Sequence, residues 1–264
     1  MKWTTQEENE LKRLYLNTSL TLNEITKKLG RTPAALNNRL AKMKVKRRLT
    51  PNSKSPKKMT PALARIHAHV CGDGSICSFQ MRDNYGYWSK YRKDPIRIRY
   101  VVNYDNNNRD LLKEFQADIY EVFGVRGQKI YRNKISVRSK RIWEFLKKMG
   151  TGDSYSWRIP KEICNSSKEV KKNWIRAFFD DEADFDDAGR IRVKCVNKKG
   201  LSQLMRMLKE FVPSHLRPKK GFYWGNTVCI NINKKDAPMF FSKIGSIRYN
   251  PKRKLNFCRD SSVG

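Results

Sequence analysis

The sequence from about residue 61 to residue 250 repeats one pattern twice, and this repeat constrains the fold more than any other feature. Each copy begins with an apolar helix that ends in an acid, Asp73 in the first copy and Glu182 in the second. Strands, an amphipathic helix, further strands and a short last helix follow in both copies. Cations in the strands fall two residues apart, as Arg97 and Arg99 do, which places charge on one face and apolar side chains on the other. The pattern predicts an α+β fold of two pseudo-symmetric αββαββα units with antiparallel sheets.

The segments of each copy can be placed from the same periodicity. Strands are expected at 96–102, 129–131 and 134–137 in the first copy, and at 190–196, 222–224 and 228–232 in the second. Residues 46–60 combine charge, Pro and Ser without an apolar period, which is typical of a linker. We therefore expect a small module at 1–47, a basic linker at 48–60, the two halves at 61–168 and 169–250, and a basic tail at 251–264.

The charge of the chain narrows the class of partner. Its 264 residues include 57 Lys and Arg against 25 Asp and Glu, a formal charge of +32 that excludes most ordinary metabolic enzymes. Such a field attracts polyanions, above all nucleic acid, with a solvated basic face or a membrane surface as weaker interpretations. No apolar run approaches the ~20 residues that span a bilayer, and the N-terminus resembles no signal peptide. The six Cys include no C-x-x-C pair. We expect a soluble intracellular protein, in the cytoplasm, nucleoid or an organelle, without disulfides or zinc knuckles.

Residues 1–47 carry signals for three short helices. Thr4 and Thr5 each precede a Glu by three positions, the capping-box arrangement. The first helix then has an apolar side formed by Leu11, Leu14 and Leu16. Gly30 ends a second helix, and Thr32 before Pro33 opens a third. The order predicts a helix-turn-helix whose third helix enters a major groove, and the opening Trp3-Thr4 is similar to the start of a Myb/SANT repeat. A helical packing domain without DNA contacts is the alternative.

The acidic residues stand out against this basic background. The segment from Asp180 to Asp187 holds six of the 25 acids. Such a cluster repels itself unless cations lie within it, and divalent metals prefer hard oxygen ligands. A solvated acidic loop is the alternative for this segment taken alone. The matching acid in the first copy, Asp73, favours a metal site.

The two acidic helix ends carry a family resemblance. The segments Ile66-His-Ala-His-Val-Cys-Gly-Asp-Gly74 and Ile175-Arg-Ala-Phe-Phe-Asp-Asp-Glu-Ala183 resemble the paired motifs of the single-chain LAGLIDADG homing endonucleases. Helices whose acids meet need small residues at their contact, which Ala68, Gly72 and Ala177 supply. Asp181 and Ala183 stand where the motif has smaller residues, so we expect a looser contact there and an effect on activity. The resemblance covers residues 61–250 and leaves the N-terminal module aside.

The resemblance implies a site-specific endonuclease that hydrolyses both strands of a long pseudo-symmetric duplex target, with one acid for each strand. Asp73 and Glu182 would bind metal together with the backbone carbonyls of Gly72 and Asp181. Mg²⁺ or Mn²⁺ would support cleavage by stabilising phosphate charge and generating hydroxide, whereas Ca²⁺ would bind without cleavage. A basic residue beside each acid is also implied. Lys140 and Lys235, which superpose when the copies are aligned, are the candidates.

Double-stranded DNA is the expected partner of a monomeric chain. The stretch 77–95, absent from the second copy, is expected to be a hairpin or loop on DNA or an aromatic flap over the core. The candidate DNA contacts are cations of the strands, this insertion and the turns, with polar residues of the third helix: Arg82, Lys90, Arg92, Arg97, Arg99, Arg132, Lys134, Arg138, Arg190, Arg192, Lys194, Lys219, Lys220, Arg31, Asn37, Asn38 and Arg39.

Other functions remain as alternatives. A LAGLIDADG body that has lost cleavage would serve as a DNA-binding regulator or as an RNA maturase that binds an intron, and a nucleic-acid-packaging protein is a third interpretation. His67, His69 and Cys71 suggest zinc, but only His67 and Cys71 share a helical face. An HNH nuclease is unsupported because only His215 remains elsewhere, and glycine-rich phosphate loops are absent.

Overall fold

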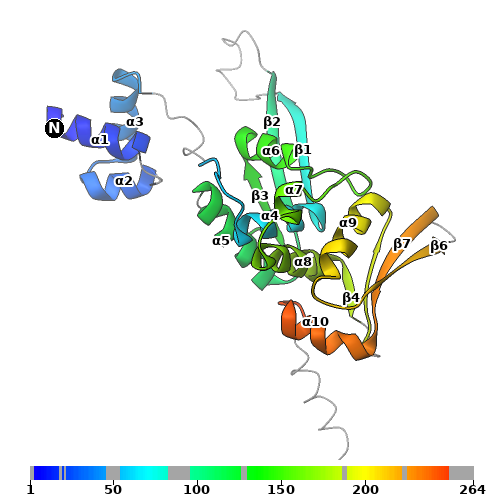
Figure 1. Ribbon diagram of the computed structural model, residues 1–264. Coiled ribbons are helices and arrows are strands. Elements are labelled where there is room, and N and C mark those ends of the chain that lie inside the picture. The colour runs from blue at the N-terminus through cyan, green and yellow to red at the C-terminus, as the bar shows by residue number, and fades with distance from the viewer. Residues whose placement is uncertain are drawn as a thin grey trace, which may run out of the picture. The chain divides into compact units, whose positions relative to one another are not determined.

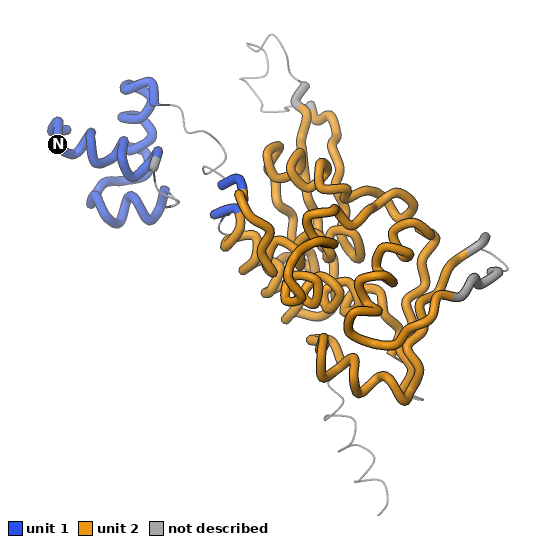
Figure 2. The backbone as a smooth tube through the Cα atoms, viewed as in Figure 1, with its two compact units in different colours: residues 1–55, 123–126 blue, residues 56–122, 127–264 orange. Residues whose placement is uncertain are grey.

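A computed structural model describes residues 3–17, 20, 22–45, 54–82, 96–125, 130–185, 189–221 and 225–249. The chain forms two compact units, one of residues 1–55 with 123–126 and the other of the remaining residues (Figure 2). None of the described helices is long and apolar enough to cross a membrane.

The N-terminal unit contains three helices, α1 (Thr5–Asn17), α2 (Leu22–Leu29) and α3 (Pro33–Lys42). Thr4 and Glu7 form the capping box, with Thr4 N donating to Glu7 Oε2 over 2.9 Å and Glu7 N donating to Thr4 Oγ1 over 3.2 Å. The N-cap of α3 is Thr32, as expected. Its core consists of Leu11, Leu14, Ile25, Leu36 and Leu40.

Two details of this unit differ from the sequence-based expectation. Glu8 forms an ion pair with Arg39 of α3, and the capping box is formed by Thr4 and Glu7. Leu16 is 38% exposed and does not join the core. The reason is helical geometry, because Leu11 and Leu14 share a face that Leu16, two positions on, cannot reach.

The first half of the body runs α4 (Pro61–Cys71), β1 (Gly74–Arg82), β2 (Ile96–Asp105), α5 (Arg109–Phe123), β3 (Lys134–Arg138) and α6 (Lys140–Lys148) (Figure 1). β1 and β2 form a long antiparallel hairpin, and β3 joins its other edge in the order β1-β2-β3. The strand expected at 129–131 is wrong at its described end, because Tyr131 forms only an isolated bridge to Lys134. Arg132 and Asn133 make the turn between them with φ of 44° and 61°.

The second half follows the short helix α7 (Lys161–Cys164). It runs α8 (Lys168–Glu182), β4 (Ala183–Phe185), β5 (Ile191–Cys195), α9 (Lys198–Leu208), β6 (His215–Gly221), β7 (Gly225–Ile232), η2 (Lys234–Asp236) and α10 (Ala237–Lys243). Its sheet has the order β4-β5-β7-β6. The structure places β6 before the segment 222–224 where a strand was expected, and those three residues lie outside the described part of the chain.

The strands separate apolar and polar side chains as their alternation predicts. Val102 and Tyr104 of β2 are fully buried, whereas Arg99 and Asn103 lie on the opposite face of the strand. In the second sheet Ile191 and Val193 are buried, and Lys194 is exposed. The buried faces pack with the helices in a core that includes Trp157, Trp174 and Phe178.

Candidate active site

Two packed helices, α4 and α8, bring the two predicted acids to the start of the two sheets. Asp73 follows α4 after Gly72, and Glu182 is the last residue of α8. Each helix begins with a side-chain cap, Thr60 for α4 and Ser167 for α8. Both helices lead at once into a strand, β1 or β4, so the acids occupy corresponding positions at a helix-to-strand junction.

The close contact between the helices depends on Gly72. A Cβ at this position would lie 2.9 Å from Cβ and 2.9 Å from Oδ2 of Asp181, too close for any other residue without a shift. Ala68 and Ala177 are also fully buried in the core. The sequence led us to expect that Asp181 loosens the contact. Instead its side chain occupies the space that the missing Cβ of Gly72 leaves.

Asp181 is the centre of a buried polar network that the sequence did not indicate. Its side chain is fully buried. Oδ2 lies 2.9 Å from Nδ1 of His69, and Oδ1 accepts from the hydroxyl of Tyr104 over 2.7 Å and from Asn106 Nδ2 over 3.3 Å. Burial alone would lower the pKa of His69, but the charge of Asp181 and, at 3.6 Å, of Glu114 raises it to about 9. A protonated His69 therefore compensates the buried carboxylate of Asp181.

The two predicted metal-binding acids are held in conditions that disfavour their charge. Desolvation and the charge of Asp181 raise the pKa of Asp73 to about 6, against a hydrogen bond of 2.8 Å from Asn106 Nδ2 that lowers it. Desolvation and the charges of Asp73 and Asp181 raise the pKa of Glu182 to about 7. Crowded carboxylates of this kind are stabilised by a cation placed between or beside them.

The donor chemistry of these acids fits a hard divalent cation. In the described ranges no three His, Cys, Asp or Glu side chains converge closely enough to hold a metal ion by themselves. Mg²⁺ commonly takes only one or two carboxylates from the protein and completes its shell with water and substrate phosphate. Asp73 and Glu182, one carboxylate for each site, match this requirement.

Each acid opens into its own cavity. Asp73 lines a polar cavity of about 780 Å³ together with Asp181, Asn106, Arg132 and Arg248. Glu182 lines a cavity of about 420 Å³ whose other residues include Gly72, Lys194, Cys195 and Trp157. Each cavity thus contains the acid of one helix and the preceding residue of the other helix, the two sources of oxygen ligands that the sequence resemblance implies.

The two lysines predicted beside the acids lie elsewhere. Lys140 begins α6, with Nζ 5.5 Å from the ring centroid of Tyr100 and 3.5 Å from Glu144 Oε1. Tyr100 precedes Tyr104 by four residues along β2, which is roughly 13 Å of extended strand. Lys235 is in η2, beyond the end of β7. Lys194 lines the cavity of Glu182, and Arg132 and Arg248 line that of Asp73, so these cations replace the two lysines as candidates.

The predicted DNA-binding cations of the sheets have mixed environments. Arg99 and Arg138 lie on the outer face of the first sheet, whereas Lys134 is 3.1 Å from Asp105 and Arg192 is 2.8 Å from Asp184. Arg190, just before β5, and Lys194 are exposed. The remaining candidates belong to strands or lie outside the described residues: Arg82 in β1, Arg97 in β2, Lys219 and Lys220 in β6, and Lys90 and Arg92 outside.

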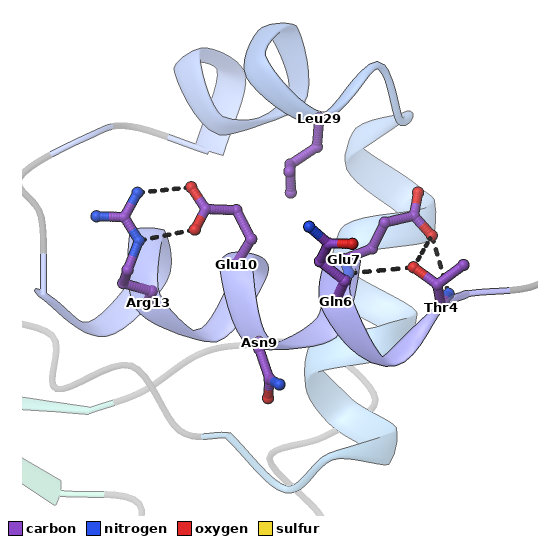
Figure 3. A pocket seen from close by; sticks show the side chains of 7 residues that line it. All are labelled: Thr4, Gln6, Glu7, Asn9, Glu10, Arg13 and Leu29. Carbon is purple, nitrogen blue, oxygen red and sulfur yellow. Dashed lines mark hydrogen bonds and ion pairs between the residues drawn. The ribbon is translucent and has the colours of Figure 1, made fainter.

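In the N-terminal unit the structure separates the predicted contacts into two pairs. Arg31 Nη2 is 2.7 Å from Glu7 Oε1, with its guanidinium 5.0 Å from the ring centroid of Trp3, and Arg39 pairs with Glu8. Asn37 and Asn38 are exposed on α3. Figure 3 shows a depression of about 460 Å³ on this unit, where Glu7 contacts Thr4 and Glu10 contacts Arg13. The acids of α1 therefore face partners within the unit.

The zinc hypothesis is not supported by the positions of its ligands. Trp174 Nε1 donates to Nδ1 of His67 over 3.0 Å, and Nε2 of His67 lies 3.1 Å from the carbonyl oxygen of Met149. Burial lowers the pKa of His67 to about 4, so it is a neutral core histidine. His69 is turned to Asp181.

Comparison with known proteins connects the body to one fold. No family model matches the chain. One of the subunits of the A-type ATP synthase of Pyrococcus abyssi is 27% identical over 123 residues, which are 43% of this chain and 12% of that much longer protein.

Solved structures give a wider match. A variant of the homing endonuclease I-DmoI in complex with its target DNA and Mn has a TM-score of 0.52 at 18% identity, covering 72% of this chain and 97% of that chain. I-DmoI with DNA and Ca has a TM-score of 0.51 at 16% identity, covering 76% and 100%. The protein contains a homing endonuclease fold. Its mixed helices and antiparallel sheets are those of this fold, and the helix pair described above is part of it.

Proposed function

We propose that the protein is a metal-dependent, site-specific DNA endonuclease of the LAGLIDADG homing type that cuts both strands of a long, pseudo-symmetric target. The observation that carries this proposal is the pair of carboxylates, Asp73 and Glu182, each at the end of one of two packed helices and each in its own cavity. A protein that only binds DNA has no need for two crowded acids with pKa values of about 6 and 7 facing a polyanion.

The residues of this chain would divide the work of hydrolysis. Asp73 and Glu182, with the carbonyls of Gly72 or Asp181 and phosphate oxygens, would hold Mg²⁺ or Mn²⁺. The metal would supply charge stabilisation at phosphorus and an activated water. Asn106 donates to both Asp73 and Asp181, and so fixes the acid relative to the helix contact. Lys194 in one cavity and Arg132 and Arg248 in the other are the cations nearest to developing phosphate charge.

The sheets and the N-terminal unit would supply the DNA contacts. Support comes from the neighbouring homing endonuclease structures, which were determined with target DNA and with Mn, Mg or Ca. We infer that the outer faces of the two sheets, with Arg99, Arg138 and Lys194, lie on duplex DNA and that both halves act within a monomer. The N-terminal unit would act as a helix-turn-helix on flanking DNA.

The test is a randomised duplex library incubated with the protein and Mg²⁺, followed by sequencing of the cut ends. The wild type is expected to yield one cut motif, and Ca²⁺ in place of Mg²⁺ to give bound but uncut duplex. Asp73→Asn and Glu182→Gln should each abolish double-strand cutting while binding stays within a few-fold. Undiminished cutting by both variants would refute the assignment. Binding of structured RNA in preference to duplex, without cutting, would favour the maturase instead.

A further inference from the structure

Arg248 sets one cavity apart from the other. Its Nη1 donates to the carbonyl oxygens of Asp180, Asp181 and Ala183 over 3.4, 3.3 and 3.4 Å, at the end of α8. Within the described part of the chain, all hydrogen bonds of this guanidinium are made by Nη1. A guanidinium has five N–H groups, so those of Nη2 and Nε are left for a ligand. The side chain is exposed and lines the cavity of Asp73.

The segment that carries Arg248 is fixed from two sides. The carboxylate of Asp180, fully buried, accepts hydrogen bonds from Ser246 Oγ over 2.5 Å, from Ile247 N over 3.1 Å and from Arg248 N over 3.3 Å. On the other side, the ring of Tyr249 stacks on Phe185 and on Phe241, with centroids 5.1 and 5.0 Å apart. In the first copy the position of Asp180 is held by Cys71, which has no such acceptor. The second copy thus uses a buried acid to place one cation.

The carbonyl of Asp181 is the oxygen that would complete a metal shell in the cavity of Asp73, and Arg248 already donates to it. Gly72, its counterpart in the cavity of Glu182, has Lys194 as the lining cation. A guanidinium matches the paired oxygens of a phosphate, whereas an ammonium is a point charge. The two cavities therefore offer a phosphodiester different partners.

We propose that Arg248 is a phosphate-binding residue of the Asp73 half-site, where its fixed guanidinium replaces the contact of a metal ion with the Asp181 carbonyl. This inference rests on the proposed endonuclease function. Arg248 changes no covalent step. One water still adds across one P–O bond, and the guanidinium stabilises the charge on the non-bridging oxygens. The two strands are then cut by unlike sites and at different rates.

The first experiment needs neither metal nor cleavage. A duplex selected by binding in EDTA is titrated by fluorescence anisotropy at several KCl concentrations. Arg248→Ala should lower the slope of log affinity against log salt by about 0.9, one phosphate contact, whereas Arg248→Lys keeps the charge and most of the slope. Arg206→Ala, which removes one exposed cation from α9, is the matched control and should leave the slope unchanged.

The second experiment measures each strand of the same duplex with separate end labels and Mg²⁺. Asp73→Asn identifies the strand that its cavity serves. Arg248→Ala should slow that strand by about 10²- to 10³-fold and the other strand by less than about threefold. An unchanged salt slope, or equal slowing of both strands, would overturn the role of Arg248. If the wild type cuts neither strand, the proposed function fails, and the metal-free slope still decides whether Arg248 contacts phosphate.

Discussion

Glu182 is placed where its own charge is unfavourable. Its pKa is raised to about 7 by desolvation and by the charges of Asp73 and Asp181, against an unfolded value near 4.3. The folded protein therefore binds this proton more tightly than the unfolded chain does. The resulting stabilisation is complete below about pH 4 and is lost as the pH rises through about 7.

We predict that Glu182→Gln stabilises the metal-free protein at pH 8, by on the order of 1–3 kcal/mol, and has little effect at pH 4. The amide removes the like-charge repulsion at high pH, when the wild-type carboxyl is ionised. Melting temperatures in EDTA at both pH values measure this. Glu144→Gln, which alters an exposed acid paired with Lys140, is the control and should shift neither value. A lower melting temperature for Glu182→Gln at pH 8 would contradict the burial argument.

Metal affinity should follow the same two acids. A divalent cation competes with the proton on Glu182 and Asp73, whose pKa values are about 7 and 6. We predict that affinity for Mn²⁺, measured by electron paramagnetic resonance on the DNA complex, falls about tenfold per pH unit below pH 6. Asp73→Asn with Glu182→Gln should remove this dependence. A constant affinity between pH 5 and 8 would exclude these acids as ligands.

At the residue scale the sequence predicted the two acids but not their partners. Asp73 and Glu182 could be found because each ends an apolar helix in matching copies. The role of Asp181 depends on His69 in another helix and Tyr104 in a strand, contacts between residues 112 and 77 positions apart. No local pattern carries such pairings. For the same reason Lys194, Arg132 and Arg248 could not be distinguished from the many other cations of the chain.

At the scale of elements, the helix contact is the part most sensitive to change. Asp181→Gly would restore a small residue of the motif, yet it would leave a buried His69 and the hydroxyl of Tyr104 without their acceptor. We predict a loss of about 3–5 kcal/mol in the free energy of unfolding, measured by urea denaturation at pH 7. Asp184→Gly, which breaks an exposed pair with Arg192, should cost much less. Equal losses for the two variants would show that the buried network contributes nothing specific.

The strands show where element boundaries escape sequence reasoning. β6 contains Pro218 and several cations, a composition that does not indicate a strand. It forms because β6 is the edge of its sheet, where a residue without an N–H is tolerated. The turn at Arg132 and Asn133 has left-handed φ values without a glycine to signal it. The helices, by contrast, were predicted from their caps and periodicity because both signals are local.

At the scale of the whole molecule, charge is distributed unevenly over the surface of each unit. Residues 1–47 hold 11 Lys and Arg against 4 Glu, and three of these Glu lie in α1. Two of those acids hold Arg31 and Arg39 within the unit. The exposed Asn37 and Asn38 of α3 are the polar side chains of the predicted recognition helix that the structure leaves at the surface. A DNA-binding role therefore belongs to the face of α3 and not to that of α1.

We predict that deleting residues 1–47 weakens DNA binding and lowers the salt slope by at least about one unit, because several phosphate contacts are lost. The cut position should not move, since both acids belong to the body. Anisotropy titrations on duplexes with and without flanking DNA measure the first effect, and end-labelled cleavage products the second. The double variant Asn37→Ala with Asn38→Ala should reproduce part of the affinity loss at unchanged salt slope, and Arg13→Ala on α1 should change neither. If the deletion leaves affinity and slope intact, the N-terminal unit is a packing domain without DNA contacts.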